Sequence, residues 1–169
     1  MRRLDAVAGR FDAVLCLWQS FGFFDDGTNA AVLAAMARKL RPGGRLVLDV
    51  HDRRFFEAHA GTRTLAVEGG HVVERTSLAD TRLRVALDYG DGGRDAFEWR
   101  LYEPEELVRL AADAGLATLM TCARFDESVS PEGTDPRVQL VFEADRGRQS
   151  PDERGGAKRE LSSGDHASR

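Results

Sequence analysis

The pattern of apolar and polar residues changes along the chain, and its first part predicts alternating strands and helices. Phe11–Trp18 is a short, almost continuous apolar run, which is typical of a parallel strand covered on both faces. A helix is expected over Thr28–Arg41, with Thr28 as its N-cap, because apolar side chains recur there on one helical stripe. Pro42-Gly43-Gly44 ends this helix, and Leu46–Val50 is a second apolar strand. Together these segments predict a strand–helix–strand unit with parallel strands and a right-handed crossover.

After these strands, the pattern of apolar and polar residues changes to a repeat of two residues, which is typical of half-buried strands. Apolar and polar side chains alternate over residues 83–89 and again over 97–102, and an earlier pair of strands is expected at 64–67 and 72–77. Glycine-rich turns separate the members of each pair. The pattern predicts an antiparallel β insertion over about 62–102, attached to one side of the α/β unit.

The last ordered elements are one helix and two strands. Pro104 suits the first position of a helix, and Gly115 suits its end. Residues 116–124 and 138–143 are expected to form a closing antiparallel hairpin. Residues 144–169 contain one large aliphatic side chain, so a disordered tail is expected there, after an α/β domain over residues 1–143.

The length and net charge of the chain limit the functions that it can have. The chain has 169 residues, enough for one domain, and a net charge of −4, which lacks the basic surface that binds nucleic acid or anionic membranes. Its apolar runs are too short to span a membrane and no secretion signal is evident, so a cytoplasmic location is expected. Cys16 and Cys122 fall in strand-like runs and are expected to be buried thiols, and neither cysteines nor histidines have metal-ligand spacing.

Three segments carry a family resemblance. They are Phe11-Asp-Ala-Val-Leu-Cys-Leu-Trp-Gln-Ser-Phe-Gly-Phe-Phe24, Leu40-Arg-Pro-Gly-Gly-Arg-Leu-Val-Leu-Asp49, and Arg100-Leu-Tyr-Glu-Pro-Glu-Glu-Leu107 running on to Leu116. In this order they resemble the C-terminal half of a class I S-adenosylmethionine-dependent methyltransferase that acts on small molecules. The resemblance implies a partial doubly wound, Rossmann-like sheet with the β insertion as a lid. It also implies S-adenosyl-L-methionine as cofactor and methyl transfer to a small-molecule acceptor.

The glycine-rich loop of that family has no counterpart here. No G-x-G-x-G segment follows a strand, and Gly90-Asp-Gly-Gly93 is a turn between alternating strands. Roughly 80 to 100 residues of strand and helix units are absent before Phe11. Our hypothesis is that the chain starts inside a gene, through a truncation, a misplaced start or a decayed copy, and is inactive on its own.

The resemblance also assigns roles to residues at the rim of the sheet. Trp18, Gln19 and Ser20 follow the first strand, where they would contact the cofactor, and Phe21 would shield the substrate from solvent. The alternative for the aromatic side chains of this loop is that they plug the core. His51 ends the next strand at the same rim and is a candidate base for a substrate amine or hydroxyl, although a lone histidine is more often structural.

Arg100 and Tyr102 lie on the strand that returns from the insertion. They resemble residues that face the substrate in lid-bearing relatives. Cross-strand pairing on an exposed sheet face is the alternative role, and it explains both residues nearly as well.

Two other functions remain open. The chain can be a non-catalytic half, or a subunit whose partner chain carries the glycine-rich loop, because the strand at 12–18 would expose an apolar edge that invites pairing or self-association. A nucleotide-dependent oxidoreductase shares the strand–helix–strand pattern, but its glycine fingerprint is equally absent and the three segments fit it less well.

Overall fold

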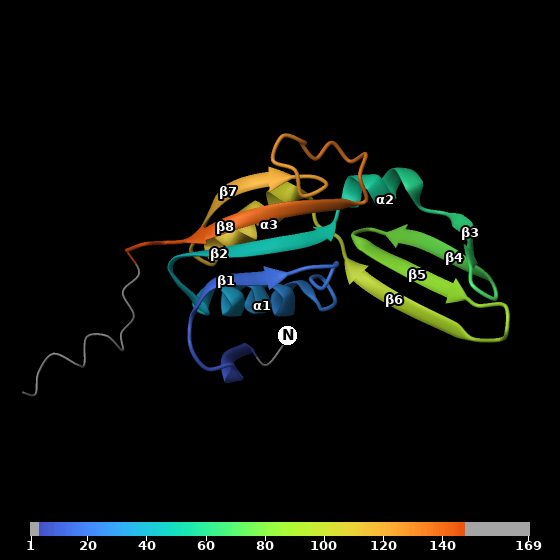
Figure 1. Ribbon diagram of the computed structural model, residues 1–169, viewed down its shortest axis with the longest axis horizontal. Helices are drawn as coiled ribbons and strands as arrows, with labels where there is room; N and C mark the ends of the chain where they lie inside the picture. Colours follow the sequence, from blue (N-terminus) through green and yellow to red (C-terminus); the bar gives the residue numbers. More distant parts are fainter. Residues whose placement is uncertain (1–3, 148–169) are drawn as a thin grey trace, which may run out of the picture.

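The computed structural model describes residues 4–147, so most of the predicted disordered tail, from residue 148 on, lies outside the described residues. Eight strands and three α-helices follow a short 3-10 helix (Figure 1). The elements, in chain order, are η1 (Leu4–Ala6), β1 (Phe11–Cys16), α1 (Asp26–Arg38), β2 (Leu40–His51), α2 (Arg53–His59), β3 (Thr62–Val67), β4 (Gly70–Ala79), β5 (Arg82–Asp88), β6 (Arg94–Arg100), α3 (Pro104–Asp113), β7 (Leu116–Cys122) and β8 (Arg137–Ala144).

The first sheet has the strand order β1-β2-β8-β7. β1 and β2 are parallel, with Val14 beside Leu46, and α1 connects them, which confirms the predicted strand–helix–strand unit. β7 and β8 pair as the predicted antiparallel hairpin. β8 also pairs antiparallel with β2, from Arg45 beside Glu143 to His51 beside Arg137. The last strand therefore lies in the middle of the sheet, against residues about 90 positions earlier.

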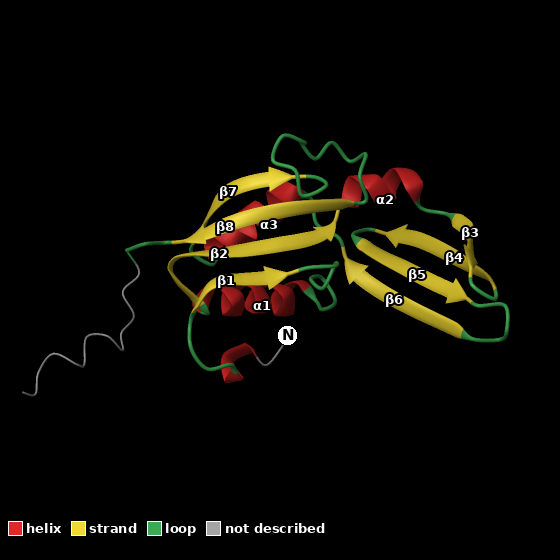
Figure 2. Cartoon of the chain, in the orientation of Figure 1, coloured by secondary structure: helices red, strands yellow, loops and turns green. Residues whose placement is uncertain are grey.

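The helices α1 and α3 pack against one face of this sheet (Figure 2). Leu33, Leu107, Leu140 and Phe142 are wholly buried between the layers. On the opposite face, Leu15 is 61% exposed, because no helix of the described residues covers that side. The prediction that this strand is covered on both faces is therefore wrong for the part of the chain that the structure describes.

The start of α1 differs from the prediction by three residues. Asp25 is its N-cap, and one carboxylate oxygen accepts the Thr28 N–H at 2.8 Å while the other accepts the Thr28 hydroxyl at 2.7 Å. Thr28 therefore lies inside the first turn. An ionised carboxylate is the stronger acceptor at the positive end of a helix, which explains why Asp25 takes the cap.

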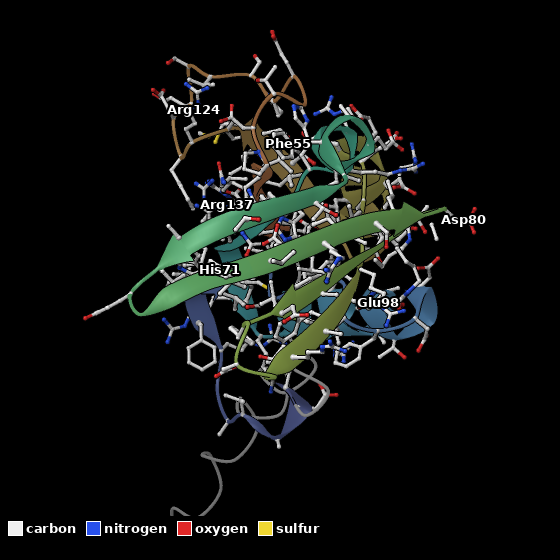
Figure 3. The ribbon with its side chains drawn as sticks, turned by 90° about the vertical axis from the view of Figure 1, so that its right-hand side faces the viewer. Phe55, His71, Asp80, Glu98, Arg124 and Arg137 are labelled. Carbon is white, nitrogen blue, oxygen red and sulfur yellow. The ribbon has the colours of Figure 1, made fainter. Side chains whose placement is uncertain are left out.

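The second sheet confirms the predicted antiparallel insertion. Its strand order is β3-β4-β5-β6, and every pair is antiparallel. Figure 3 looks onto this sheet from its outer side, where Glu98 lies, and shows it across the end of the first sheet. Leu83 is wholly buried and Trp99 half-buried on the inner face, which packs toward the first sheet. The insertion thus faces the carboxyl ends of β1 and β2.

Both cysteines are buried, as predicted, and neither forms a disulfide. Burial raises the pKa of the Cys16 thiol to about 11, so the reactive thiolate is scarce at neutral pH. Among residues 4–147, no group of three or more His, Cys, Asp or Glu is placed to hold a metal ion. No helix in the described part of the chain is long and apolar enough to cross a membrane. The cytoplasmic location stays a prediction.

Candidate active site

A cleft of about 670 Å³ lies where β1 and β2 end, beneath α2 and the second sheet. Parallel strands of α/β sheets usually bind their ligands at this end. Its walls combine aromatic side chains with a few polar groups, which is the usual composition of a small-molecule site. The lining residues discussed below are Trp18, Gln19, His51, Phe55, Phe56, Arg63, Glu74 and Arg137.

The turn after β1 carries the residues expected to contact the cofactor. Trp18 and Gln19 both have left-handed backbones, with φ of 55° and 52°, which are rare for residues other than glycine. The Trp18 indole is on the surface, 73% exposed, while Gln19 and Ser20 are half-buried. Trp18 and Gln19 line the cleft, and Ser20 follows them directly.

This turn is tied to β2 through Asp49. The Trp18 N–H donates to the Asp49 carboxylate at 3.0 Å, and the Gln19 N–H donates to the Asp49 carbonyl at 3.0 Å. Arg137, from β8, donates to the same carboxylate at 2.9 Å, and its guanidinium lies 4.7 Å from the centre of the Trp18 ring. The cation–π contact and the hydrogen bonds together hold the Trp18–Gln19 turn in place at the side of the cleft.

His51 lies at the end of β2 with its ring against two aromatic side chains. The Phe56 and Trp99 rings meet it edge-on, at centroid distances of 4.7 and 5.6 Å. The Nδ1 atom lies 3.4 Å from the Pro136 carbonyl oxygen, which can only accept, so Nδ1 carries the proton and Nε2 has the lone pair. Burial lowers the pKa of His51 to about 4, and the imidazole is therefore neutral at pH 7.

The aromatic wall on α2 was not predicted. Asp52 caps this helix, because its carboxylate accepts the Arg54 N–H at 3.0 Å. Phe55 stacks on His59 with centroids 4.2 Å apart and meets Phe56 edge-on. An aspartate before two adjacent phenylalanines was the available signal, but seven residues are too few to show a helical period.

The far end of the cleft is polar. Arg63 and Glu74, on the paired strands β3 and β4, form an ion pair at 2.6 Å. Only 13% of the Glu74 side chain is exposed, which makes this pair less screened than a surface one. The cleft therefore offers aromatic walls near His51 and charged groups of both signs farther out.

The predicted substrate residues Phe21, Arg100 and Tyr102 lie in the interior instead of lining this cleft. The Phe21 and Tyr102 rings pack 5.6 Å apart, and both residues are buried. The Arg100 guanidinium pairs with Asp26 at 3.1 Å and Glu106 at 2.9 Å. Arg100 and Tyr102 also border a separate hollow of about 310 Å³. Contact of these three residues with a substrate stays a prediction.

Gly22 joins the loop after β1 to the second sheet. Its carbonyl accepts the Arg100 N–H at 2.7 Å, and its φ is 101°. A Cβ atom at this position would overlap the Arg100 carbonyl oxygen. Only glycine therefore allows the loop to approach the end of β6 so closely.

Comparisons with known proteins identify the fold through structures alone. No family model matches the chain, and no curated protein matches it by sequence. Many solved structures match the chain, and several methyltransferases are among them, including one described as S-adenosylmethionine-dependent and one solved with S-adenosylmethionine bound. The arrangement described above is part of the Rossmann-like fold of these methyltransferases, as the resemblance implied.

Three of these structures show the extent of the likeness. A methyltransferase from Clostridium acetobutylicum ATCC 824 has a TM-score of 0.72 and 13% identity over 82% of this chain and 60% of its own. The amino pentose methyltransferase CalS10 from Micromonospora echinaspora, solved with S-adenosylmethionine bound, has a TM-score of 0.58 and 22% identity. The match covers 81% of this chain and 59% of CalS10. The sugar N-methyltransferase KedS8 from Streptoalloteichus has a TM-score of 0.60 and 24% identity. The match covers 82% of this chain and 58% of KedS8. This chain thus spans about 60% of their length.

Proposed function

We propose that this chain forms the acceptor side of a methyltransferase that moves a methyl group from S-adenosyl-L-methionine to a small molecule. The observation that carries the proposal is the cleft at the ends of β1 and β2, which holds a neutral imidazole between aromatic walls. The fold and the position of the cleft support the same function. Two similar structures are sugar methyltransferases by name, so small amines are the first acceptors to test.

The residues after β1 fit one side of the cofactor. Within the described part of the chain, the side chains of Gln19 and Ser20 make no hydrogen bond, and they remain available to a ligand. The exposed Trp18 ring beside them offers an apolar surface. When bound, S-adenosyl-L-methionine supplies an electrophilic methyl group, and the protein's task is alignment and exclusion of water.

His51 is the proposed group that handles the acceptor's proton. The Nε2 lone pair of His51 accepts a hydrogen bond from the N–H or O–H group of the small molecule that is to be methylated. This bond turns the lone pair of the reacting nitrogen or oxygen atom away from the imidazole. The proton that the acceptor loses passes to Nε2 and then to water, because the low pKa of His51 makes its protonated form short-lived. Phe55 and Phe56 hold the rest of the acceptor and keep the cleft apolar.

The alternative is a subunit that becomes active with a partner chain carrying the glycine-rich loop. It is supported by β1, which pairs on one side only among the described residues, and by the exposed Leu15 beside that edge. An unpaired strand of this kind accepts another strand readily. Inactivity of the isolated chain is expected under the first function as well, because the glycine-rich loop has no counterpart in the sequence.

Calorimetry with S-adenosylmethionine and S-adenosylhomocysteine separates the two functions. Micromolar binding by the chain alone, followed by label transfer from methyl-labelled cofactor to small amines, supports the first and contradicts the hypothesis that the chain is incomplete. No heat from the chain alone, but heat after co-expression with a glycine-loop partner, supports the second. No heat and no transfer in either preparation would contradict both.

A matched pair of histidine variants tests the role of His51. His51→Asn removes the Nε2 acceptor from the cleft, whereas His71→Asn changes an exposed histidine on the second sheet. We expect label transfer to fall on the order of 100-fold in the first variant and to stay unchanged in the second. Equal activity of both variants would remove His51 from the mechanism.

A further inference from the structure

Asp49 is a buried carboxylate that the proposed reaction does not use. It is wholly buried near the end of β2, and its carboxylate accepts three hydrogen bonds from two segments, the turn after β1 and the strand β8. One oxygen accepts the Gln139 side-chain N–H at 2.7 Å, and the other accepts the Trp18 N–H at 3.0 Å and the Arg137 guanidinium at 2.9 Å. A buried carboxylate needs such partners, because an unpaired one is costly to remove from water.

The hydrogen-bond partners of Asp49 connect it to two turns with left-handed backbones. Trp18 and Gln19 form the first, with left-handed backbones held by the carboxylate and the carbonyl of Asp49. Arg124 and Phe125 form the second, with φ of 58° and 56°. The Phe125 N–H donates to the Gln139 side-chain oxygen at 3.0 Å, so Gln139 links this turn to Asp49.

The two turns present aromatic rings around one guanidinium. Arg137 lies 4.7 Å from the Trp18 ring centre and 5.7 Å from that of Phe125. Both rings are largely exposed, at 73% and 58%. Exposed aromatic residues in left-handed conformations persist only where their surroundings determine them, and such strain gathers at functional sites.

We propose that Asp49 is a positioning residue, which sets the backbone of the Trp18–Gln19 turn and thereby shapes the proposed cofactor side of the cleft. This role rests on the proposed function for its purpose, but its geometry can be tested without any ligand. Only a carboxylate suits the position, because every one of its three partners donates a hydrogen bond. In Asp49→Asn the side-chain NH₂ would face a donor, and one of these contacts must break.

The test uses Trp18 as its own reporter. The chain has two tryptophans, so Trp99→Phe leaves Trp18 as the single tryptophan, whose fluorescence is excited selectively over that of the two tyrosines. In that background we compare Asp49→Asn with Asp52→Asn, which removes an equally buried carboxylate that caps α2 instead. We expect Asp49→Asn to raise the acrylamide quenching constant of Trp18 about twofold and the exchange rate of its amide at least tenfold. Asp52→Asn should change neither quantity.

Gln139→Met provides a second variant, in case Asp49→Asn does not fold. It removes the link to Phe125 but leaves the Asp49 carboxylate bonded to Trp18 and Arg137. We expect faster amide exchange at Phe125 with unchanged exchange at Trp18. The inference is overturned if a folded Asp49→Asn protein keeps wild-type exchange at Trp18, or if Gln139→Met and Asp52→Asn release Trp18 equally.

Ligand binding then distinguishes this inference from the proposed function. If the wild-type protein binds S-adenosylhomocysteine in calorimetry, Asp49→Asn should weaken that affinity on the order of tenfold, because the turn is no longer preorganised. A mobile Trp18 turn with unchanged affinity would contradict the positioning role. A wild-type protein without affinity, but with an Asp49-dependent turn, would contradict cofactor binding by the chain alone and leave the role of Asp49 in holding the turn established.

Discussion

At the scale of single residues, sequence reasoning located one half of the cleft. Trp18, Gln19 and His51 line the cleft, because the carboxyl ends of adjacent parallel strands meet at one edge of a sheet, and their contacts with cofactor or substrate stay predictions. Arg137 could not be assigned to the cleft. It enters through the pairing of β8 with β2, and its hydrogen bond with Asp49 joins positions 88 residues apart, which no local period encodes.

His51 should make stability depend on pH. Its pKa is about 6.5 in an unfolded chain and about 4 in the folded protein, so the unfolded state holds more protons between these values. The free energy of unfolding should therefore fall as pH drops from about 6.5 to 4, by on the order of 2 kcal/mol from this residue. Urea denaturation at several pH values measures it.

The carboxylates also titrate near this range, so the comparison needs variants. His51→Asn should flatten the decrease between pH 6.5 and 4, while His71→Asn, at an exposed position, should keep it. If the free energy of unfolding depended on pH equally in His51→Asn and the wild type, the burial of His51 would not control its protonation.

Gly22 is a position where the backbone leaves no room for a Cβ atom. Gly22→Ala combines a φ of 101° with overlap on the Arg100 carbonyl oxygen. Gly69→Ala is the matched control, since its φ is 86° and no atom lies within 4 Å of the added Cβ. We expect a loss of about 1 kcal/mol for Gly69→Ala and about 3 kcal/mol or more for Gly22→Ala. Equal losses in urea denaturation would show that overlap at Gly22 costs nothing.

At the scale of elements, prediction succeeded where the chain marks both ends of a helix. For α3, Pro104 supplies the start, and Gly115, with a φ of 79°, follows its end. The structure adds a capping box that links Glu103 and Glu106. The helix α2 was missed because its seven residues are too few to show an apolar stripe, and its aromatic side chains face the cleft. Gly61 follows its end as Gly115 follows that of α3, but a glycine without a helical period before it does not identify a helix.

Glu106 connects the start of α3 to the interior. Its carboxylate accepts the Glu103 N–H at 2.8 Å and the Arg100 guanidinium at 2.9 Å, and these bonds lower the pKa of Glu106 despite its partial burial. Glu106→Ala removes the capping contact and one partner of a buried arginine. We expect about 2 kcal/mol less stability in thermal denaturation.

Glu105→Ala is the control at the neighbouring, exposed position, and it should change stability by less than about 0.5 kcal/mol. A similar loss in both variants would indicate a general effect of negative charge at the helix N-terminus. A loss confined to Glu106→Ala would confirm the specific contacts with Glu103 and Arg100.

At the scale of the whole molecule, the sequence predicted two sheets but not how the first one is assembled. The alternation over 83–89 and 97–102 identified strands of the insertion, and the apolar runs at 11–18 and 46–50 identified two strands of the first sheet, because period distinguishes half-buried from buried strands. The position of β8 between β2 and β7 depends on long-range pairing. The uncovered face of the first sheet was not predicted either, since the apolar run in β1 indicates burial on both sides.

The exposed edge of the first sheet should determine how the protein associates. Leu15, on β1, is 61% exposed, and Leu119, on β7 at the opposite edge, is 46% exposed. If the predicted self-association uses the strand at 12–18, Leu15→Lys should shift sedimentation toward the monomer, because a charge on an edge strand opposes pairing. Leu119→Lys should leave the association constant unchanged. A larger effect of Leu119→Lys would place the contact on β7 and exclude β1 as the paired edge.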